Sequence, residues 1–384
     1  KTWIMKTFGQ QYFEKTAYVN FDNNARMKQV FEGDLDIERL VLSISAETGV
    51  SIEAENTLII FDEVQEVPKA LTSLKYFYEN APQYAIVAAG SLLGVALHQG
   101  TSFPVGKVDF LDLYPLNFRE FLCAMGEKQF VSMLDSCDTQ MVTVFKTKYI
   151  ERLREYYFVG GMPEVVKDFS EKKDYNRVRA IQKNLINYYQ QDFSKHAEIK
   201  LVPRLNLVWN SIPMQLAKEN KKFFFGKIKK GARSSDYEIA IQWLQDCGLI
   251  YKVSRVNEPH MPLKAYKSMN AYKLFMLDVG LLGALSELEA ETILDGNDMF
   301  VEFKGALTEQ YVLQQLISDT RYTPYYFVTD KSTFEQDFLI QKGKDIVPIE
   351  VKAEANIKSQ SLKAYCEKYH PEKAVRFSSK KYID

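Results

Sequence analysis

The stretch TLIIFDE at residues 57–63 constrains the fold most, because its bulky apolar residues run without interruption into two adjacent acids. An apolar run without polar alternation is typical of a strand that is buried on both faces of a parallel sheet. YAIVAAGS at 84–91 repeats this pattern. Helical periodicity occurs between such runs, and strands that alternate with helices indicate a doubly wound α/β domain.

The opening segment, KTWIMKTFGQQY, is predicted to be an amphipathic helix with Trp3, Ile4 and Phe8 on its apolar side. Asp34 is a short polar residue directly before a helical pattern, so it suits an N-cap. The other elements predicted in residues 1–120 are a strand at 17–22, a helix at 34–45 and a strand at 107–116.

The two acids that end the first apolar run suit a nucleotide site. Asp62 and Glu63 are expected at the carboxyl edge of the sheet, where ligands of α/β proteins bind. An Asp there can hold the water shell of Mg²⁺, and the adjacent Glu can polarise an attacking water. The alternative is a strand that simply ends in solvated acids.

The first two residues supply the other half of such a site. A phosphate-binding loop ends in Gly-Lys-Ser/Thr and runs into a helix, and Lys1-Thr2 stands directly before one. The Lys1 ammonium would face the β- and γ-phosphates, and the Thr2 hydroxyl would be a metal ligand. Ser91, after the second apolar run, is placed where a polar side chain can sense the γ-phosphate, although it suits a helix N-cap equally well.

Composition sets the broad class of the protein. A chain of 384 residues is long enough for two or three domains, and 46% hydrophobic residues can fill several cores. The net charge of −1 gives no overall attraction to DNA or to an anionic membrane. Because no signal peptide and no apolar run of membrane length is visible, we expect a cytoplasmic protein without a membrane segment.

Beyond residue 120 the pattern changes twice. Residues 123–200 are helical and are broken at FVGGMPEVV, whereas 201–285 end in a helix near Cys247-Gly248 that is followed by the strand-like LIYKV. That order is found in a winged helix. The elements predicted for 286–384 are a helix at 304–318, strands at 324–329, 335–341 and 346–353, and a helix near 357–369.

A basic turn at residues 218–233 holds seven Lys and Arg side chains against one acid, Glu219. In a winged helix these cations can neutralise DNA phosphates while the helix that begins near Ser234 enters a groove. Asp236 and Glu238 in the first turn of that helix oppose DNA binding. A solvated turn over buried Phe side chains is an equal alternative, and a winged helix can also bind a protein partner.

Acids of the last hundred residues are predicted to converge. Residues 335–353 are expected to form a hairpin that turns at KGKD, with Glu350 and Lys352 on one face and apolar residues on the other. Glu309 falls on an apolar helix face, so it needs a partner or a metal. With Asp337, this segment resembles the Mg²⁺ site of PD-(D/E)XK nucleases; decoration of an exposed hairpin by charges is the alternative.

Several longer motifs carry a resemblance that covers almost the whole chain: TLIIFDEVQEVP, AAGSLLG, LYPLNFREFL, FVGGMPEVV, KLFMLDVGLL, GALTEQYVLQQL and PIEVKA. Together they resemble bacterial and archaeal ATPases that join an AAA-type P-loop domain to a C-terminal domain of unknown function. The resemblance implies ATP and Mg²⁺ as cofactors, with Lys1, Thr2, Asp62 and Glu63 in the roles given above. The GxxxxG part of the loop does not precede Lys1, so we expect the sequence to open at the cut edge of a P-loop.

These observations predict an α/β protein with a P-loop (ASCE/AAA-like) parallel-sheet domain, a helical and winged-helix middle region and a C-terminal α/β nuclease-like domain. The predicted boundaries are 1–122, 123–200, 201–285 and 286–384. The leading function is an Mg²⁺-dependent ATPase whose nucleotide state controls the winged-helix and nuclease-like module. An ATP-dependent DNA nuclease and a non-catalytic interaction protein stabilised by nucleotide are the alternatives. Arg119 is a candidate arginine finger, and the sequence leaves the oligomeric state open.

Overall fold

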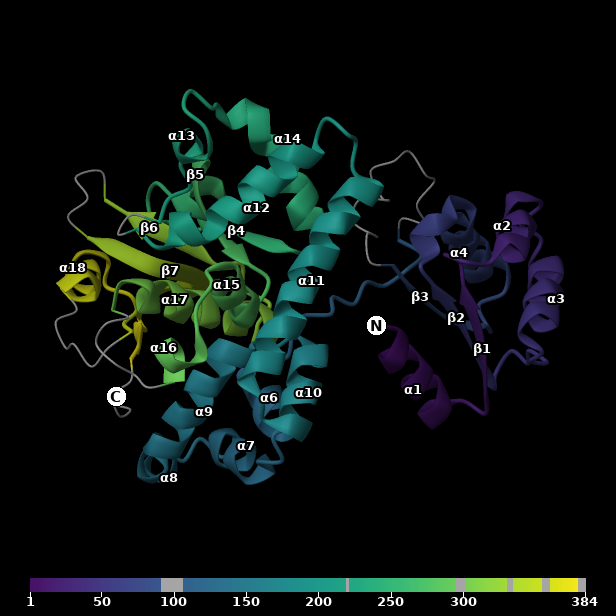
Figure 1. Cartoon of the computed structure of the whole chain (residues 1–384), viewed down its shortest axis with the longest axis horizontal. Helices are drawn as coiled ribbons and strands as arrows, with labels where there is room; N and C mark the ends of the chain where they lie inside the picture. Colours follow the sequence, from purple (N-terminus) through teal and green to yellow (C-terminus); the bar gives the residue numbers. More distant parts are fainter. Residues whose placement is uncertain (91–105, 219–220, 295–300, 330–333, 354–359, 379–384) are drawn as a thin grey trace. The chain divides into compact units, whose positions relative to one another are not determined.

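The computed structural model describes residues 1–90, 106–218, 221–294, 301–329, 334–353 and 360–378 (Figure 1). The chain divides into two compact units, Lys1–Leu113 with Asp246–Gly248, and Tyr114–Gln245 with Leu249–Asp384. Each unit has its own sheet, with strand order β1-β2-β3 in the first and β5-β4-β6-β7-β8-β9 in the second. No helix in the described ranges is long and apolar enough to cross a membrane.

The first unit is a three-layer α/β domain, in which all strand pairs are parallel. Its elements are α1 (Thr2–Tyr12), β1 (Lys15–Asn20), α2 (Ala25–Glu32), α3 (Ile37–Thr48), β2 (Thr57–Asp62), the short 3₁₀ turn η1 (Val64–Glu66), α4 (Pro68–Asn80) and β3 (Ala85–Ala89). Helices α2, α3 and α4 lie on one side of the sheet and α1 lies on the other (Figure 1). The predicted parallel α/β arrangement is confirmed.

Strand β2 explains this layering, because it is buried along its whole length, as its sequence predicts. Ile59 and Phe61 belong to the core beneath α2–α4, where the Phe61 ring packs edge-on against Phe21 at 5.5 Å between centroids. Leu58 and Ile60 point to the opposite face and pack against Met5 of α1. Two apolar faces on one strand require helices on both sides of the sheet.

Helix α1 does not bury the side that was predicted. Trp3, Ile4 and Phe8 are 75%, 48% and 43% exposed, whereas Met5 and Gly9 lie against the sheet. A Cβ atom on Gly9 would lie 2.5 Å from the hydroxyl oxygen of Thr16. Gly9 therefore allows helix α1 to approach strand β1 closely. This close approach, and not the size of the apolar side chains, determines which side of α1 is buried.

Other predictions for the first unit are wrong in detail. Residues 107–116 form no strand, and β1 begins two residues before the predicted 17–22. Asp36 is the N-cap of α3, since its carboxylate accepts from the Arg39 N–H at 2.9 Å, while Asp34 accepts from the Asp36 N–H. Strand β3 is only half-buried within the described residues, although its sequence resembles that of β2.

The second unit combines a helical segment with a mixed sheet. Its helices are α6 (Phe118–Ala124), α7 (Lys128–Asp135), α8 (Thr139–Val144), α9 (Lys146–Val159), α10 (Pro163–Lys172), α11 (Tyr175–His196), α12 (Val202–Leu216), α13 (Phe225–Ile228), α14 (Ser234–Asp246), α15 (Val279–Leu285), α16 (Ala290–Leu294), α17 (Val301–Asp319) and α18 (Gln360–Tyr369), with the 3₁₀ turn η2 (Leu263–Tyr266). Its strands are β4 (Ile250–Val256), β5 (Lys267–Met276), β6 (Tyr325–Val328), β7 (Glu335–Lys342), β8 (Asp345–Val351) and β9 (Val375–Phe377). The predicted C-terminal order of helix, three strands and helix is confirmed by α17, β6–β8 and α18.

The six-stranded sheet crosses a predicted domain boundary. Strands β4 and β5 form an antiparallel hairpin after α12, α13 and α14, which is the order predicted for a winged helix. Strand β4 also pairs in parallel with β6, so elements on both sides of residue 285 share one sheet. On this sheet, Tyr325 and Phe327 pack with Tyr365 of α18 on one face. The predicted division of the second unit at residue 285, and the winged-helix and nuclease-like assignments, stay predictions.

The motifs of the second unit meet around the buried carboxylate of Asp278. It accepts from the Gly161 N–H at 2.6 Å and from Nε2 of Gln314 at 3.2 Å. A Cβ atom on Gly160, whose φ is +73°, would lie 2.2 Å from Oδ1 of Asp278. The carbonyl oxygen of Gly161 accepts from the Leu116 N–H at 2.7 Å. Four motifs that are far apart in the sequence are thus joined by hydrogen bonds inside the second unit: LYPLNFREFL, FVGGMPEVV, KLFMLDVGLL and GALTEQYVLQQL.

Candidate functional site

The carboxyl edge of the small sheet brings Thr2 and Asp62 into contact. Parallel pairing aligns Asn20 of β1 with Asp62 at the end of β2. Helix α1 begins at the same edge, where the Thr2 hydroxyl donates to Oδ2 of Asp62 at 2.6 Å. Asp62 is only 2% exposed, so it is a fixed acceptor. Two hard oxygen atoms thus meet where the sequence predicted Mg²⁺ ligands.

Lys1 and Glu63 lie beside this pair. The Lys1 ammonium donates to the carbonyl oxygen of Gly90, directly after β3, at 3.0 Å. Glu63 has φ 52° and ψ 44°, a left-handed conformation that is uncommon for a residue with a side chain. Its backbone N–H donates to Oδ1 of Asp62 at 3.1 Å. The chain therefore turns sharply at the end of β2 and sets two acids side by side at the sheet edge.

Three residues of this edge were missed by sequence reasoning: Tyr18, Asn20 and Gln65. The Tyr18 hydroxyl donates to Oδ2 of Asp62 at 2.8 Å, and burial together with this hydrogen bond raises the pKa of Tyr18. Nε2 of Gln65 donates to Oε2 of Glu63 at 2.7 Å. The signal was present for Asn20, because a polar residue that ends an adjacent parallel strand lies at the same edge.

These groups fit a magnesium nucleotide. Mg²⁺ prefers oxygen ligands and usually takes one or two protein oxygens beside phosphates and water, which Thr2 and Asp62 can supply. Lys1 supplies a cation beside the first turn of α1, whose free N–H groups favour an anion. Bound Mg²⁺-ATP would bring the metal and the phosphoanhydride to this edge. The chain's own residues would hold and orient these groups, and Glu63 would be the candidate to accept a proton from water.

A second charged cluster lies in the other unit and includes the predicted nuclease-like residues. Glu309 of α17 is 4% exposed, and its Oε1 pairs with the ammonium of Lys221. Asp337 of β7 is buried near Glu309, because burial and then the charge of Glu309 raise the pKa of the Asp337 carboxyl. Oδ2 of Asp337 accepts from the Val351 N–H at 2.8 Å, which ties it to strand β8. The structure thus brings Glu309 and Asp337 together inside the unit.

A bulge in β7 directs Asp337 towards α17. Tyr325 pairs with Leu339 and Phe327 pairs with Gln336, so β7 carries one more residue than β6 between these pairs. A β-bulge changes the direction of the side chains beside it. The bulge lies in β7 opposite β6, whereas the β7–β8 pairs from Phe338–Ile349 to Lys342–Asp345 keep a regular register. Glu350 is buried, so the alternative of charges on an exposed side of the hairpin does not hold for this residue.

Two lysines neutralise the cluster. Lys273 of β5 is 1% exposed, and its ammonium lies 2.6 Å from Glu335 and 3.6 Å from Glu309. Burial opposes the ionisation of Glu309, but Lys221 and Lys273 outweigh it and lower its pKa. Lys352 is separate, at 3.2 Å from Glu350. Among the described residues no group of three or more Asp, Glu, His or Cys side chains could hold a metal ion. Metal binding by Glu309, Asp337, Glu350 and Lys352 stays a prediction that this charge balance does not favour.

Asp337 predicts a pH dependence of stability. Burial, followed by the charge of Glu309, raises the pKa of Asp337 to about 8. An unfolded Asp loses its proton near pH ~4, so the folded protein binds more protons between these values and its stability falls as pH rises through them. Asp337→Asn should abolish this fall and be more stable than wild type above the raised pKa. The difference in unfolding free energy between variant and wild type against pH is the measurement. The control is Glu171→Gln, at an exposed site of α10, whose difference in unfolding free energy from wild type should not change with pH. A difference for Asp337→Asn that is equally independent of pH would contradict the raised pKa of Asp337.

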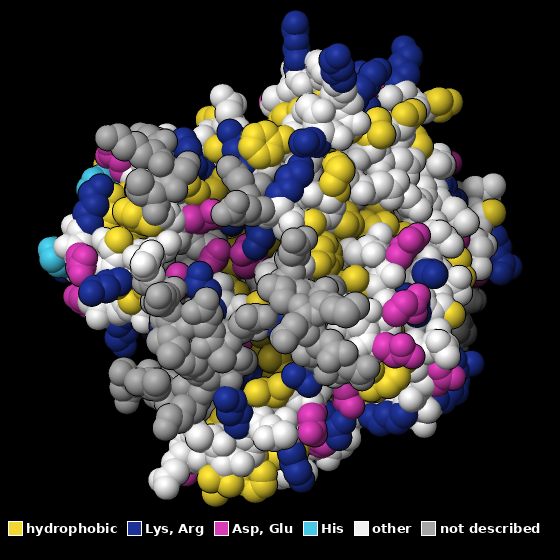
Figure 2. Space-filling model, turned by 60° about the vertical axis from the view of Figure 1, so that its left-hand side comes forward, with side chains coloured by type: hydrophobic (Ala, Val, Ile, Leu, Met, Phe, Trp, Pro, Cys, Tyr) yellow, Lys and Arg dark blue, Asp and Glu magenta, His cyan; other side chains and the backbone are white. Residues whose placement is uncertain are grey.

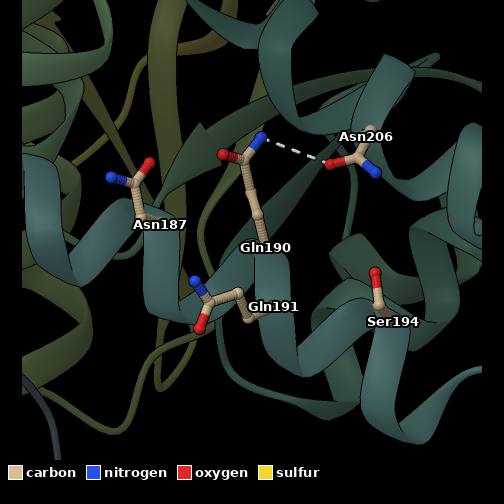
Figure 3. A pocket seen from close by; sticks show the side chains of 5 residues that line it. All are labelled: Asn187, Gln190, Gln191, Ser194 and Asn206. Atoms are coloured by element: carbon tan, nitrogen blue, oxygen red, sulfur yellow. Dashed lines mark hydrogen bonds between the residues drawn. The ribbon is translucent and has the colours of Figure 1, made fainter.

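The remaining predicted site residues lie elsewhere. Ser91 is outside the residues that the structure describes. Arg119, the candidate finger, forms an ion pair with Asp135 of α7. A shallow depression between α11 and α12 is lined by Asn187, Gln190, Gln191, Ser194 and Asn206 (Figure 3). Nε2 of Gln190 donates there to Oδ1 of Asn206 at 3.2 Å, and none of the five lining side chains is charged.

The parallel sheet, helix α1 and the acids at the carboxyl edge of the first unit fit the fold of a P-loop ATPase domain. Residues 1–122 match a family described as "AAA domain". Residues 150–292 and 304–383 match two families that are each described as a domain of unknown function, DUF8612 and DUF4143. Among curated proteins, none matches this sequence.

Among solved structures, the chain is similar to the Walker-type ATPase PABY2304 of Pyrococcus abyssi. The TM-score is 0.40 and the sequence identity is 13%, over 71% of this chain and 84% of that chain.

Proposed function

We propose that the first unit binds ATP with Mg²⁺ and hydrolyses it. The hydrogen bond of 2.6 Å between Thr2 and Asp62 carries this proposal, because it joins the two residues expected to share the metal. In this assignment Lys1 faces the phosphates, Thr2 and Asp62 hold the metal, and Glu63 activates water. The match of residues 1–122 to an AAA domain supports it.

We further propose that the nucleotide state controls the second unit, which is the effector part of the protein. Chain connection supports this, because the segment that leaves the first unit enters the second at Tyr114 and is held at Leu116. There the Leu116 carbonyl oxygen accepts from the Tyr156 hydroxyl at 2.5 Å, and the next residue, Asn117, donates from Nδ2 to Asp319 at 2.6 Å. A firmly held entry segment can transmit a displacement. Because lysines neutralise the charged cluster, this proposal assigns no nuclease activity to the effector.

Lys1→Ala tests the nucleotide site directly. Hydrogen bonds to charged groups contribute about 1.5–3 kcal/mol, so the variant should bind Mg²⁺-ATP roughly 10- to 100-fold more weakly. Equilibrium binding of a fluorescent ATP analogue to the full-length protein measures the loss. Lys15→Ala is the matched control, because Lys15 begins β1 at the opposite edge of the same sheet and pairs with Glu53. Equal affinity of Lys1→Ala and Lys15→Ala would contradict the assignment, and absence of Mg²⁺-ATP turnover in the wild type would contradict the proposed hydrolysis.

A further inference from the structure

Phe224, in the basic turn, is an exposed aromatic residue on a fixed backbone. Gln215 of α12 is 1% exposed and holds both polar backbone groups of Phe224. Its Oε1 accepts from the Phe224 N–H at 3.2 Å, and its Nε2 donates to the Phe224 carbonyl oxygen at 3.0 Å. Phe224 as a whole nevertheless remains 39% exposed. A buried side chain that fixes the backbone of an exposed ring orients that ring towards solvent.

Neighbouring residues anchor the same segment. Phe223 is 3% exposed, its N–H donates to the Tyr272 carbonyl oxygen at 2.8 Å, and its ring stacks on the Tyr272 ring. Lys221 binds Glu309, as described for the charged cluster. The predicted burial of Phe223–Phe225 is therefore correct for Phe223 and wrong for Phe224. Phe223 anchors the turn in the core, whereas the exposed side chain of Phe224 is not needed for that anchoring. The Phe224 ring can therefore contact a ligand.

Cations surround this ring. The ammonium groups of Lys218 and Lys222 lie 5.9 and 5.7 Å from the ring centroid of Phe224. Four further cations follow in the turn and are exposed or nearly so, namely Lys227, Lys229, Lys230 and Arg233. Burial and the charge of Lys227 lower the pKa of Lys218, as expected where cations crowd together. Lys and Arg side chains project from the top of Figure 2, the part of the molecule where α13 and α14 lie in Figure 1.

The acids of α14 are engaged locally. Oδ2 of Asp236 accepts from the Arg233 N–H at 3.0 Å, and Oε1 of Glu238 accepts from the Ser234 hydroxyl at 2.6 Å. Both acids come after the basic turn in the sequence, and these hydrogen bonds are to a backbone N–H and a hydroxyl group. Within the described residues, no ion pair joins Lys227, Lys229, Lys230 or Arg233 to an acid. The turn therefore keeps an excess of positive charge around a presented aromatic ring.

We propose that the basic turn binds single-stranded nucleic acid, with a base stacked on Phe224 and phosphates beside the surrounding cations. A presented aromatic ring within a positive surface is how proteins bind single strands without reading sequence, because every base has a face that can stack. A duplex hides those faces, and the acidic first turn of α14 opposes entry of that helix into a groove. The inference goes beyond the proposed ATPase function, and its test needs no nucleotide.

Fluorescence anisotropy with a labelled oligothymidine of about 20 nucleotides, which exceeds the site of one single-strand module, tests the ring. Phe224→Ala should weaken binding roughly tenfold, the size expected for loss of one stacked base. Tyr188→Ala is the matched control, because Tyr188 is a 55% exposed aromatic residue on α11. It should bind like the wild type. A duplex of the same length should bind more weakly than the single strand and should be insensitive to Phe224→Ala.

Salt dependence tests the cations. Each phosphate that a cation neutralises on a single strand contributes about −0.7 to the slope of log affinity against log salt, so four contacts predict a slope of about −3. The triple variant Lys227→Gln, Lys229→Gln, Lys230→Gln should reduce this slope by about 2. The triple variant Lys128→Gln, Lys148→Gln, Lys200→Gln removes equal charge from other exposed positions of the same unit and should leave the slope unchanged.

Three outcomes would overturn the proposal. The first is unchanged oligothymidine affinity in both Phe224→Ala and the triple variant of the basic turn. The second is tighter binding of polyglutamate than of oligothymidine, which would assign the turn to an acidic protein partner. The third is binding to phosphatidylserine vesicles under salt conditions where the oligonucleotide is not bound, which would assign it to a membrane surface.

Discussion

Glu63→Gln is expected to retain ATP binding and to lower ATP turnover by roughly 10²- to 10⁴-fold, the usual contribution of a general base. The amide has the shape of the carboxylate but cannot accept a proton from the attacking water. The left-handed backbone at residue 63 and the hydrogen bond from Gln65 hold this side chain at the sheet edge. Glutamine offers the same acceptor oxygen to Gln65, so the loss should fall on proton transfer and leave the geometry intact.

The measurement pairs two assays on the same preparation: steady-state hydrolysis at saturating Mg²⁺-ATP and equilibrium binding of the nucleotide. Glu66→Gln is the matched control, since Glu66 ends the 3₁₀ turn that begins directly after Glu63 and pairs with Lys28 at 3.9 Å. That variant should turn over ATP at the wild-type rate. A wild-type rate in Glu63→Gln would mean that another group activates the water, and lost binding would mean that Glu63 holds the nucleotide.

Much of the first unit could be predicted from sequence because its signals are local. An uninterrupted apolar run defined β2, and the acids at its end marked the edge of the sheet where α1 also begins. The errors occurred where distant residues decide. Nothing local shows that Thr16 selects Gly9, and with it Met5, as the contact side of α1. The requirement for glycine at position 90 also depends on a distant residue, because a Cβ atom there would lie 2.3 Å from Oε1 of Gln65.

The charged cluster of the second unit was foreseen only in part. The helical spacing of Glu309 showed that a carboxylate on an apolar face needs a partner, and the hairpin pointed to Asp337. The partners themselves, Lys221 and Lys273, lie in other predicted regions, and neither the basic turn nor the motif KLFMLDVGLL showed that its lysine pairs with Glu309. Lys273 occupies an otherwise apolar strand end, KLFM, where a lone lysine resembles a surface residue. The bulge in β7 likewise depends on pairing with β6.

The largest stability effect is expected for Lys273→Met. This ammonium is buried between Glu335 and Glu309 and lies 4.9 Å from the centroid of the Tyr326 ring. Methionine has a similar length, so the variant removes the charge with little change of volume. Breaking a buried ion pair by removing one partner costs about 3–5 kcal/mol, because the other charge remains buried. We expect a loss of this size in the second unit.

Tryptophan fluorescence during urea unfolding isolates that unit, because Trp209 and Trp243 are buried in it while Trp3 of the first unit is exposed. Lys363→Met is the control: this lysine is exposed on α18 and pairs with Glu367, so it should change the unfolding free energy by at most ~0.5–1 kcal/mol. An equally small effect of Lys273→Met would show that the ion pairs of Lys273 with Glu335 and Glu309 do not stabilise the second unit.

Charge and packing can be separated by adding Glu309→Gln. If the penalty comes from an uncompensated carboxylate, the double variant should be less destabilised than the sum of the two single variants, and the difference measures their coupling. A packing defect would instead give additive losses.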